Sequence, residues 1–279
     1  MSSEQWTVGD LLDCAIEAAR CAGDHALANR DRRQEANAVT HHDVKLKLDV
    51  ECQAIAETVV RDRFPSHDIL GEEDDHAAAM PPAGEADETL WPMASDHTLW
   101  VIDPIDGTVN FSHGLPQWCC SVGVLQGGQP VAGVVYAPAL GELYAATCDT
   151  PATCNGEPIH VSGTTRIEES IVMTGVDRHH DGRVPPLAVF NAIANQAQRP
   201  RIMGSAAMDM CNVAAGRADG YMETGIFLWD VAAAGLIVRQ AGGRGETLQR
   251  AQGFGMQYMA TNGRIHDALR ASVLGALGR

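Results

Sequence analysis

The sequence of 279 residues predicts a mixed α/β protein, and three patterns support this fold class. Apolar residues recur at helical spacing from Val8 to Ala22, which indicates an amphipathic helix. Short apolar runs separated by turns fill residues 119–147, as in a meander of antiparallel strands. After residues 155–156, strand patterns alternate with helix patterns. We therefore expect an antiparallel sheet followed by an α/β half.

The first hundred residues predict two helices and one long loop. The first helix begins at a capping box around Thr7 and extends to about Asn29. The second helix covers 49–64 and is stopped by Pro65. Residues 75–97 are acidic, rich in alanine and proline, and aperiodic, which predicts a loop insertion. This loop is either a lid near a functional site or an uninvolved surface excursion.

The segment before the second helix predicts a strand. Residues 43–49 alternate between polar and apolar side chains, and this alternation places Lys45, Lys47 and Asp49 on the same side. The two lysines either lie near a phosphate or an acidic cluster, or they face solvent.

The remaining elements follow in chain order. The meander predicts antiparallel strands at 121–125, 131–136 and 143–147. The later pattern predicts strands at 171–174, 202–203, 220–223 and 257–260, and helices at 187–197, at 205–215, from 230 and from about 265. We expect residues 1–150 to form an N-terminal half with the antiparallel sheet, and residues 151–279 to form an α/β half. The two halves are expected to pack as one compact unit.

Composition excludes several classes of protein. The chain has 20 basic and 36 acidic residues, and its net charge of −16 repels nucleic-acid backbones and anionic membranes. The sequence has no apolar run of about 20 residues, as a membrane span needs, and no signal-peptide pattern, so we expect it in the cytoplasm. Its eight cysteines form no Cys-x-x-Cys pair, which disfavours zinc ribbons and redox motifs.

An apolar strand pattern leads into two carboxylates, Asp103 and Asp106. Residues 99–102 are typical of a buried strand, and Pro104, which lacks an N–H, predicts that the strand stops at Asp103. The two aspartates then share one tight turn and can face a common hard cation such as magnesium. Gly107 permits close approach to a ligand, and the following amides can open a phosphate-binding helix end. A plain turn with solvated or helix-capping aspartates explains this segment equally well.

Two other segments end in acids. Residues 68–74 form a short apolar run that closes with Glu72 and two further acids, although such charge runs are usually solvated. Asp230 follows a tryptophan and precedes a stretch rich in alanine, which predicts a buried helix with Asp230 at its start. An ordinary helix cap would explain Asp230 alone.

Taken together, residues 72–73, 103–108 and 229–230 resemble the inositol monophosphatase family in their order and spacing. This family belongs to the lithium-sensitive, magnesium-dependent phosphatases. The resemblance extends from the first helix through the helix after Asp230, with support from residues 154–157, 204–207 and 218–223. It implies a layered α-β-α-β-α sandwich of the sugar-phosphatase type.

The resemblance also implies roles for single residues. Two or three Mg²⁺ ions would be held by Glu72, Asp103, the carbonyl of Ile105, Asp106 and Asp230. Catalytic roles are implied for Glu72 and for the pair Asp49 and Thr108, which would position and deprotonate the attacking water. Contacts with the substrate or its phosphate are implied for Ile105, Asp106, Gly107, Thr108, Ser205, Ala206, Glu223 and Asp230.

The expected activity is magnesium-dependent hydrolysis of a small phosphate monoester. No arrangement of cysteine or serine calls for a covalent intermediate, so direct attack by water is the simpler hypothesis. Inositol monophosphate is the first choice of substrate. Fructose-1,6-bisphosphatase, 3′-phosphonucleotide phosphatase and histidinol-phosphate phosphatase activities are the alternatives, and a catalytically silent metal-binding regulator is the non-enzyme alternative. The resemblance further suggests a homodimer.

Overall fold

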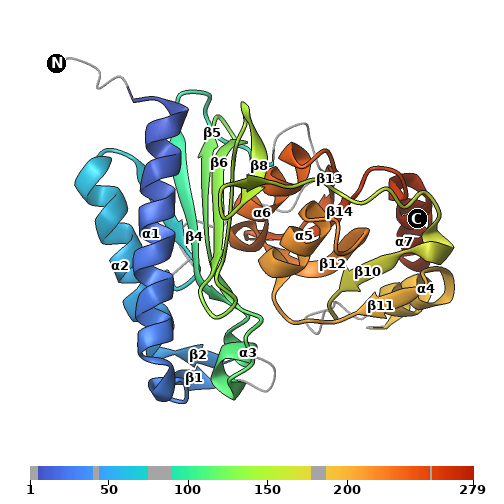
Figure 1. The fold of residues 1–279 in the computed structure, drawn as a ribbon, viewed down its shortest axis with the longest axis horizontal. Coiled ribbons are helices and arrows are strands. Elements are labelled where there is room, and N and C mark those ends of the chain that lie inside the picture. Colours follow the sequence, from blue (N-terminus) through green and yellow to red (C-terminus); the bar gives the residue numbers. More distant parts are fainter. Residues whose placement is uncertain (1–5, 40–43, 75–89, 177–186, 252) are drawn as a thin grey trace.

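Five layers alternate helix, sheet, helix, sheet and helix in the computed structural model (Figure 1). The structure describes residues 6–39, 44–74, 90–176, 187–251 and 253–279. The three helix layers are α1 (Val8–Ala28) with α2 (Lys47–Arg63), α5 (Ala206–Ala214) with α6 (Leu228–Gln240), and α4 (Ala188–Gln196) with α7 (His266–Ala276). The predicted layered α-β-α-β-α sandwich is confirmed.

The first sheet has seven strands and lies between α1 and α2 on one face and α6 on the other. Strands β3 and β4 are parallel, and every other neighbouring pair in this sheet is antiparallel. The strands, in sheet order, are β3 (Asp68–Gly71), β4 (Thr98–Asp106), β5 (Cys119–Gln126), β6 (Gln129–Ala137), β7 (Glu142–Thr147), β8 (Thr150–Cys154) and β9 (Glu157–Pro158). The predicted meander is therefore confirmed, and β8 and β9 extend it.

The second sheet has five strands, with α5 and α6 on its inner face and α4 and α7 outside. Its strands, in sheet order, are β11 (Arg199–Arg201), β10 (Ile171–Thr174), β12 (Gly220–Phe227), β14 (Gly255–Thr261) and β13 (Arg244–Arg250). The expected strand at 202–203 is wrong, because β11 ends at Arg201 and the Ile202 side chain is 51% exposed before the turn at Gly204. The sequence patterns also missed β13.

Short elements complete the fold. They are the ribbon of β1 (Ala36–Val39) and β2 (Val44–Leu46), the helix α3 (Thr108–His113), and two single turns of 3₁₀ helix at Arg30–Arg32 and Ile167–Glu169. Residues 75–89 of the expected loop lie outside the described residues, whereas Trp91 packs into the core. No helix among the described residues is long and apolar enough to span a membrane.

The two N-terminal helices begin with side-chain caps. The predicted capping box is confirmed, because the Asp10 amide donates to Thr7 Oγ1 over 3.2 Å and the Thr7 amide donates to Asp10 Oδ2 over 2.7 Å. Asp49 caps α2 in a similar way, since its Oδ2 accepts from the Leu46 amide over 2.7 Å. This cap starts the helix at Lys47 and ends the predicted 43–49 strand early.

The expected shared side of Lys45, Lys47 and Asp49 is therefore wrong. Positions 47 and 49 lie in the first turn of α2, where residues two apart point in divergent directions. Lys47 is exposed and Asp49 is buried. The side chain of Lys45 lies outside the described part of the structure.

Strand β4 does not stop at Asp103, as the proline suggested, but continues to Asp106. Asp103 pairs with Ser121 and Asp106 pairs with Cys119, so three steps along β4 match two steps along β5. The extra residue makes a bulge, where Pro104 tolerates the loss of its N–H. In a regular strand, residues three apart face opposite sides. The bulge therefore lets both aspartates face the same side.

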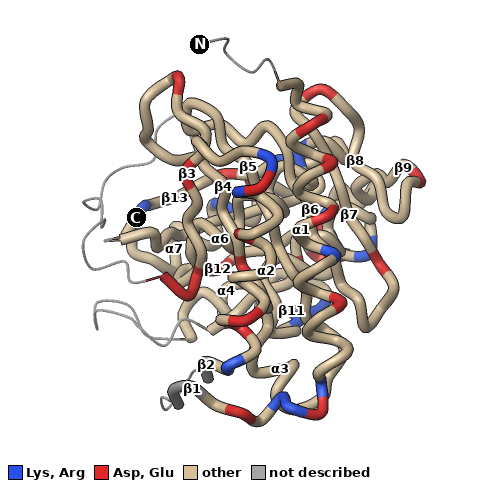
Figure 2. Tube along the Cα trace, turned by 90° about the vertical axis from the view of Figure 1, so that its left-hand side faces the viewer, with Lys and Arg blue, Asp and Glu red and all other residues tan. Residues whose placement is uncertain are grey.

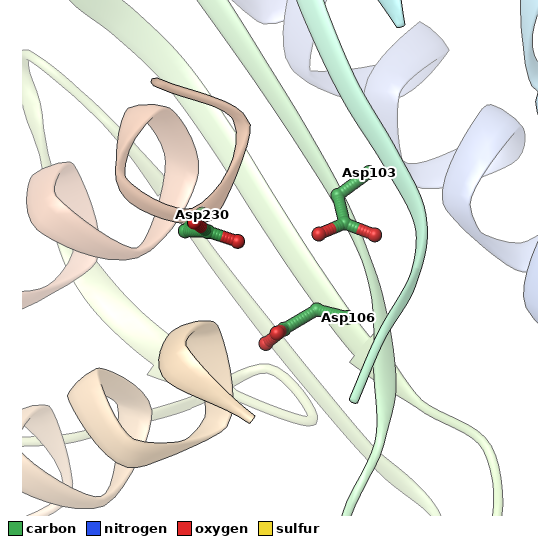
Figure 3. Close-up of side chains that lie close together, drawn as sticks. All are labelled: Asp103, Asp106 and Asp230. Carbon is green, nitrogen blue, oxygen red and sulfur yellow. The ribbon is translucent and has the colours of Figure 1, made fainter. Parts of the chain in front are cut away.

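Helix α6 packs closely on the first sheet because glycines lie beneath it. A Cβ atom at Gly123 would lie 2.6 Å from the Cβ of Ala232, and one at Gly133 would lie 2.8 Å from the Cα of Ala233. Real side chains do not tolerate such contacts, so small residues on both partners are required. This close packing brings the start of α6, with Asp230, beside the end of β4 (Figure 3).

Candidate active site

Three buried aspartates converge where β4 ends and α6 begins (Figure 3). Asp103 and Asp106 come from β4, and Asp230 comes from the first turn of α6. One carboxylate oxygen of each residue lies within 4.8 Å of the others, and each residue is at most 8% exposed. Segments more than 120 positions apart in the chain therefore form one acidic cluster.

Asp106 is held by a set of hydrogen-bond donors. Its Oδ2 accepts from Ser205 Oγ and from the Ala207 amide, each over 2.7 Å, and its Oδ1 accepts from the Ala206 amide over 3.2 Å. The Cys119 thiol lies 3.6 Å from Oδ2 as a weaker donor. These donors fix the orientation of the carboxylate and favour its charged form.

Asp230 combines a helix-capping role with its place in the cluster. Its Oδ2 accepts from the Phe227 amide over 2.7 Å, which satisfies the N–H of the residue that precedes α6. Asp230 is thus the third residue of the helix and not its N-cap residue, yet its carboxylate caps the helix end. The capping interpretation and the cluster interpretation are both correct for this residue.

The pKa values of the three aspartates are raised above their ordinary value of 3.8. Burial is the largest cause for each pKa shift. The negative charges of Glu72, Asp106 and Asp230 raise the pKa of Asp103 further. Hydrogen bonds from Ser205 and from the following amides oppose the shift in the pKa of Asp106. Among the residues that the structure describes, negative charges thus gather here without an ion pair to a basic side chain.

The cluster fits a hard divalent cation. All of its donors are carboxylate oxygens, which are the ligands that Mg²⁺ prefers. The Oδ1 atom of Asp103 is buried and has no hydrogen-bond partner within the described chain. A buried oxygen in this state is costly unless a ligand satisfies it. We conclude that these residues form an acidic site of the metal-binding type.

Most of the metal and phosphate residues implied by the sequence line one cavity of about 190 Å³. Its walls are formed by Glu72, Asp103, Ile105, Asp106, Gly107, Thr108, Val109, Gly204 and Asp230. Glu72 directly follows β3, and its amide donates to the Ile102 carbonyl on β4 over 3.0 Å. The parallel pairing of β3 and β4 therefore delivers Glu72 to the same edge as Asp103.

Gly107 makes the turn between β4 and α3. Its φ of 93° lies in the left-handed region, and a Cβ atom there would lie 3.0 Å from the Gln117 carbonyl oxygen. The predicted helix after Gly107 is confirmed as α3. The Thr108 hydroxyl donates to the Ile105 carbonyl over 2.9 Å, so both groups line the cavity in a fixed arrangement.

The other implied residues lie on neighbouring elements. Ser205 is buried and directed at Asp106, and the amide of Ala206 contacts the same carboxylate. Glu223 lies on β12, and its Oε2 accepts from the Tyr221 hydroxyl over 3.0 Å. Asp49 lies in the first turn of α2 and is not among the residues that line the cavity. Its pairing with Thr108 stays a prediction.

The sequence patterns missed Asp209, which lies on α5 one turn after Ser205. It is 2% exposed, and its Oδ1 has no hydrogen-bond partner among residues that the structure describes. Burial and the charges of Asp106 and Glu223 raise its pKa well above 3.8. The available signal was the position of Asp209 four residues after Ser205, which places both side chains on the same face of a helix.

The layered fold and the buried acidic cluster define the class of a metal-dependent phosphatase of the sugar-phosphatase type. The sequence profile of the inositol monophosphatase family matches residues 8–276. The chain belongs to the inositol monophosphatase family. It is therefore a phosphatase of this family that has an acidic metal site and acts on a phosphorylated small molecule.

Individual relatives agree with this assignment. The chain is 36% identical to an inositol-1-monophosphatase of Synechocystis sp., over 92% of this chain and 86% of that protein. It is 33% identical to a fructose-1,6-bisphosphatase/inositol-1-monophosphatase of Thermotoga maritima, over 92% of this chain and 93% of the relative. The solved inositol monophosphatase of Anabaena superposes with a TM-score of 0.78 at 31% identity, over 96% of each chain.

Proposed function

We propose that this protein hydrolyses inositol monophosphate in a Mg²⁺-dependent reaction, by direct attack of water on phosphorus. The observation that carries the proposal is the convergence of Asp103, Asp106 and Asp230 within 4.8 Å, in a cavity that also contains the Gly107-Thr108 turn. Carboxylates and a phosphate-sized opening beside backbone amides are what hydrolysis of a phosphate monoester requires.

The cation-binding role is assigned to the residues of the cavity wall. Glu72, Asp103, the Ile105 carbonyl, Asp106 and Asp230 would hold two or three Mg²⁺ ions. When bound, Mg²⁺ offsets the charge that develops on phosphoryl oxygens and lowers the pKa of water. The raised pKa values of Asp103 and Asp230 support this assignment, because like charges gathered by the fold favour a bound cation.

The remaining roles fall to residues around the metal ligands. Asp49 and Thr108 orient the attacking water and accept its proton, and the amides of Gly107 and Thr108 receive the phosphate. Ser205 and Ala206 hold Asp106 in place and, with Glu223, contact the hydroxyl groups of the substrate. Support comes from the cavity position of Gly107 and Thr108 and from the contacts of Ser205 with Asp106.

The overall charge makes this local arrangement important. Acidic and basic residues are interspersed over the face that α1 and α2 cover (Figure 2). Because the net charge is −16, long-range attraction does not draw an anionic substrate to the protein. Bound cations in the cavity would therefore have to provide the attraction.

Inositol monophosphate is preferred among substrates because of the unbroken Asp-Gly-Thr-x-Asn-Phe run at 106–111 and because of Glu223. The printed name of the Thermotoga maritima relative supports fructose 1,6-bisphosphate as the second candidate. A panel of phosphate esters tests this choice, and it includes a 3′-phosphonucleotide and histidinol phosphate. The highest kcat/KM for inositol monophosphate is expected, and a large preference for a bisphosphate would overturn it.

Loss of activity in a ligand variant separates the enzyme from a silent metal-binding regulator. Phosphate release that needs Mg²⁺ and disappears in Asp103→Asn is expected. Trapping a phosphorylated side chain during turnover would exclude direct attack by water. The homodimer and the cytoplasmic location expected from the sequence stay predictions, and light scattering of the purified protein tests the first of them.

A further inference from the structure

A second cavity lies at the other end of α6, away from the acidic cluster. It has a volume of about 180 Å³ and lies between β6 of the first sheet and β13 and β14 of the second. Asp230 is in the first turn of α6 and Arg239 is in the last, so the two sites are separated by about 13 Å along the helix axis. Nothing in the proposed phosphatase reaction uses this second cavity.

The hydroxyl group of Tyr258 lies at the wall of the cavity. Tyr258 lines the cavity and is 4% exposed, and its hydroxyl makes no hydrogen bond to any residue that the structure describes. Gly235 and Gly245 leave room for this hydroxyl, since Cβ atoms there would lie 2.6 Å and 2.1 Å from its oxygen. Because Tyr258 lines the cavity, its hydroxyl can donate a hydrogen bond to a ligand that enters it.

Arg239 places a guanidinium group at the same cavity. Arg239 lines the cavity and is exposed, and within the described part of the chain its side chain has no hydrogen bond or salt bridge. Burial raises the pKa of Tyr258, and the nearby positive charge of Arg239 opposes that shift. Both residues line the same cavity, so the hydroxyl and the guanidinium can act on one ligand.

The carboxylate that lines the cavity is already satisfied by the chain. Glu246 accepts from His266 Nε2 over 2.8 Å and from Arg270 Nε over 2.7 Å, and Arg244 lies 3.4 Å away. The cavity thus offers free donors and no free acidic acceptor, which favours a ligand that brings acceptors. The single positive charge of Arg239 matches a ligand with one negative charge.

We propose that this cavity binds a small organic monocarboxylate. Its carboxylate accepts from the Tyr258 hydroxyl and the Arg239 guanidinium, and its hydrocarbon part lies against Leu90, Pro130 and Leu236. The combination of one cationic donor, one neutral donor and apolar walls is typical of sites for such ligands. The bound ligand would contact both sheets near the C-terminal end of α6, and Asp230 lies near the N-terminal end of the same helix.

Isothermal titration calorimetry of the dialysed, metal-free protein with hexanoate tests the proposal, with hexanol as the uncharged control. Saturable binding of hexanoate is expected. Arg239→Gln should weaken it by about tenfold or more, and Tyr258→Phe by about fivefold, because each removes a donor to a charged acceptor. Arg264→Gln changes another exposed arginine, whose side chain makes no hydrogen bond or salt bridge to the described residues, and it should leave binding unchanged.

The same titration on Asp103→Asn separates this cavity from the acidic cluster, and unchanged binding of hexanoate is expected. Circular dichroism confirms that each variant is folded. Equal binding of hexanol and hexanoate would overturn the proposal, because the donors would then play no part. Absence of binding in the wild type, or wild-type affinity in folded Arg239→Gln and Tyr258→Phe, would also overturn it and leave the cavity to water.

Discussion

The acidic cluster at the start of α6 and Glu246 near its end have pKa values that are shifted in opposite directions. The first is the acidic cluster of Asp103, Asp106 and Asp230, where burial and neighbouring negative charges raise the pKa of Asp103. The second is Glu246, where burial also acts to raise the pKa, but hydrogen bonds from His266 and Arg270 prevail and lower it. Basic side chains of the described residues neutralise Glu246, whereas the acidic cluster has no such ion pair there and fits a cation from solution.

The largest effect is expected from Asp103→Asn. Phosphatase activity should fall by more than about 100-fold, since even residues that only support a metal ligand cost up to that factor. The metal-free protein should become more stable, because one of the repelling charges is removed. Phosphate release and thermal unfolding measure the two effects. An active variant, or a less stable metal-free variant, would contradict the contrast between the two regions.

The next effect is stabilisation by Mg²⁺. A ligand at 100 times its Kd stabilises the folded state by about 2.7 kcal/mol, which shifts the Tm of a protein of this size by about 5 °C. We expect such a shift for the wild type and for Glu246→Gln, but not for Asp103→Asn. Differential scanning calorimetry with and without MgCl₂ measures the Tm. An equal Tm shift in Asp103→Asn would show that the acidic cluster is not the Mg²⁺ site.

Glu246→Gln should reduce stability by about 1–2 kcal/mol, because it weakens charge-assisted hydrogen bonds from His266 and Arg270. Unlike the changes in the acidic cluster, this loss should be the same with and without Mg²⁺. Urea unfolding measures it. A loss that disappears on addition of Mg²⁺ would show that the two regions do not differ in the proposed way.

The pH dependence of stability should also have opposite signs in the two regions. The raised pKa of Asp103 makes the metal-free folded state bind a proton that the unfolded state has released. That contribution is present below pH 3.8 and is lost as the pH rises through the folded-state pKa. The lowered pKa of Glu246 stabilises the protein above pH 4.5, and this contribution is lost as the pH falls through its folded-state pKa.

Urea unfolding of the metal-free protein between about pH 4 and pH 8 measures this difference. The wild type should lose stability with rising pH relative to Asp103→Asn, and Glu246→Gln should change chiefly at the acidic end. Parallel curves for the wild type and Asp103→Asn would contradict the raised pKa.

The smallest effect is expected at the donors that hold Asp106. Ser205→Ala removes a 2.7 Å hydrogen bond and should lower activity by about tenfold, within the range for supporting residues of a metal ligand. Cys119→Ala removes a weak donor at 3.6 Å and should change activity by less than about threefold. Steady-state kinetics compares them, and a larger loss for Cys119→Ala than for Ser205→Ala would show that the thiol is the more important donor.

Local sequence signals predicted helices and strands well where the apolar residues followed a single helical or strand periodicity. The capping box at Thr7, the meander at 119–147 and the helix near Asp230 all needed only short-range pattern. The bulge at Pro104 was missed because it depends on register with β5, which lies elsewhere in the chain. The start of α2 was misplaced because the Asp49 cap competes with an alternating pattern.

The candidate site followed from motif spacing more than from physical pattern. Each of Glu72, Asp103 and Asp230 alone was explained by a solvated face, a turn or a helix cap, and only the resemblance joined them. Motif spacing does not show how the acids come together. The fold shows that the glycines at 123 and 133 let α6 approach the sheet. Asp209 could have been found from its helical spacing after Ser205. The cavity near Tyr258 lay beyond any local signal, because residues from both sheets line it.

The acidic cluster as a cation site is the central claim, and a crystal soaked in MnCl₂ tests it most directly. Anomalous difference density is predicted between the carboxylates of Asp103, Asp106 and Asp230, with Asp103→Asn losing that density under the same soak. An empty cluster, or manganese bound only elsewhere on the protein, would contradict the account.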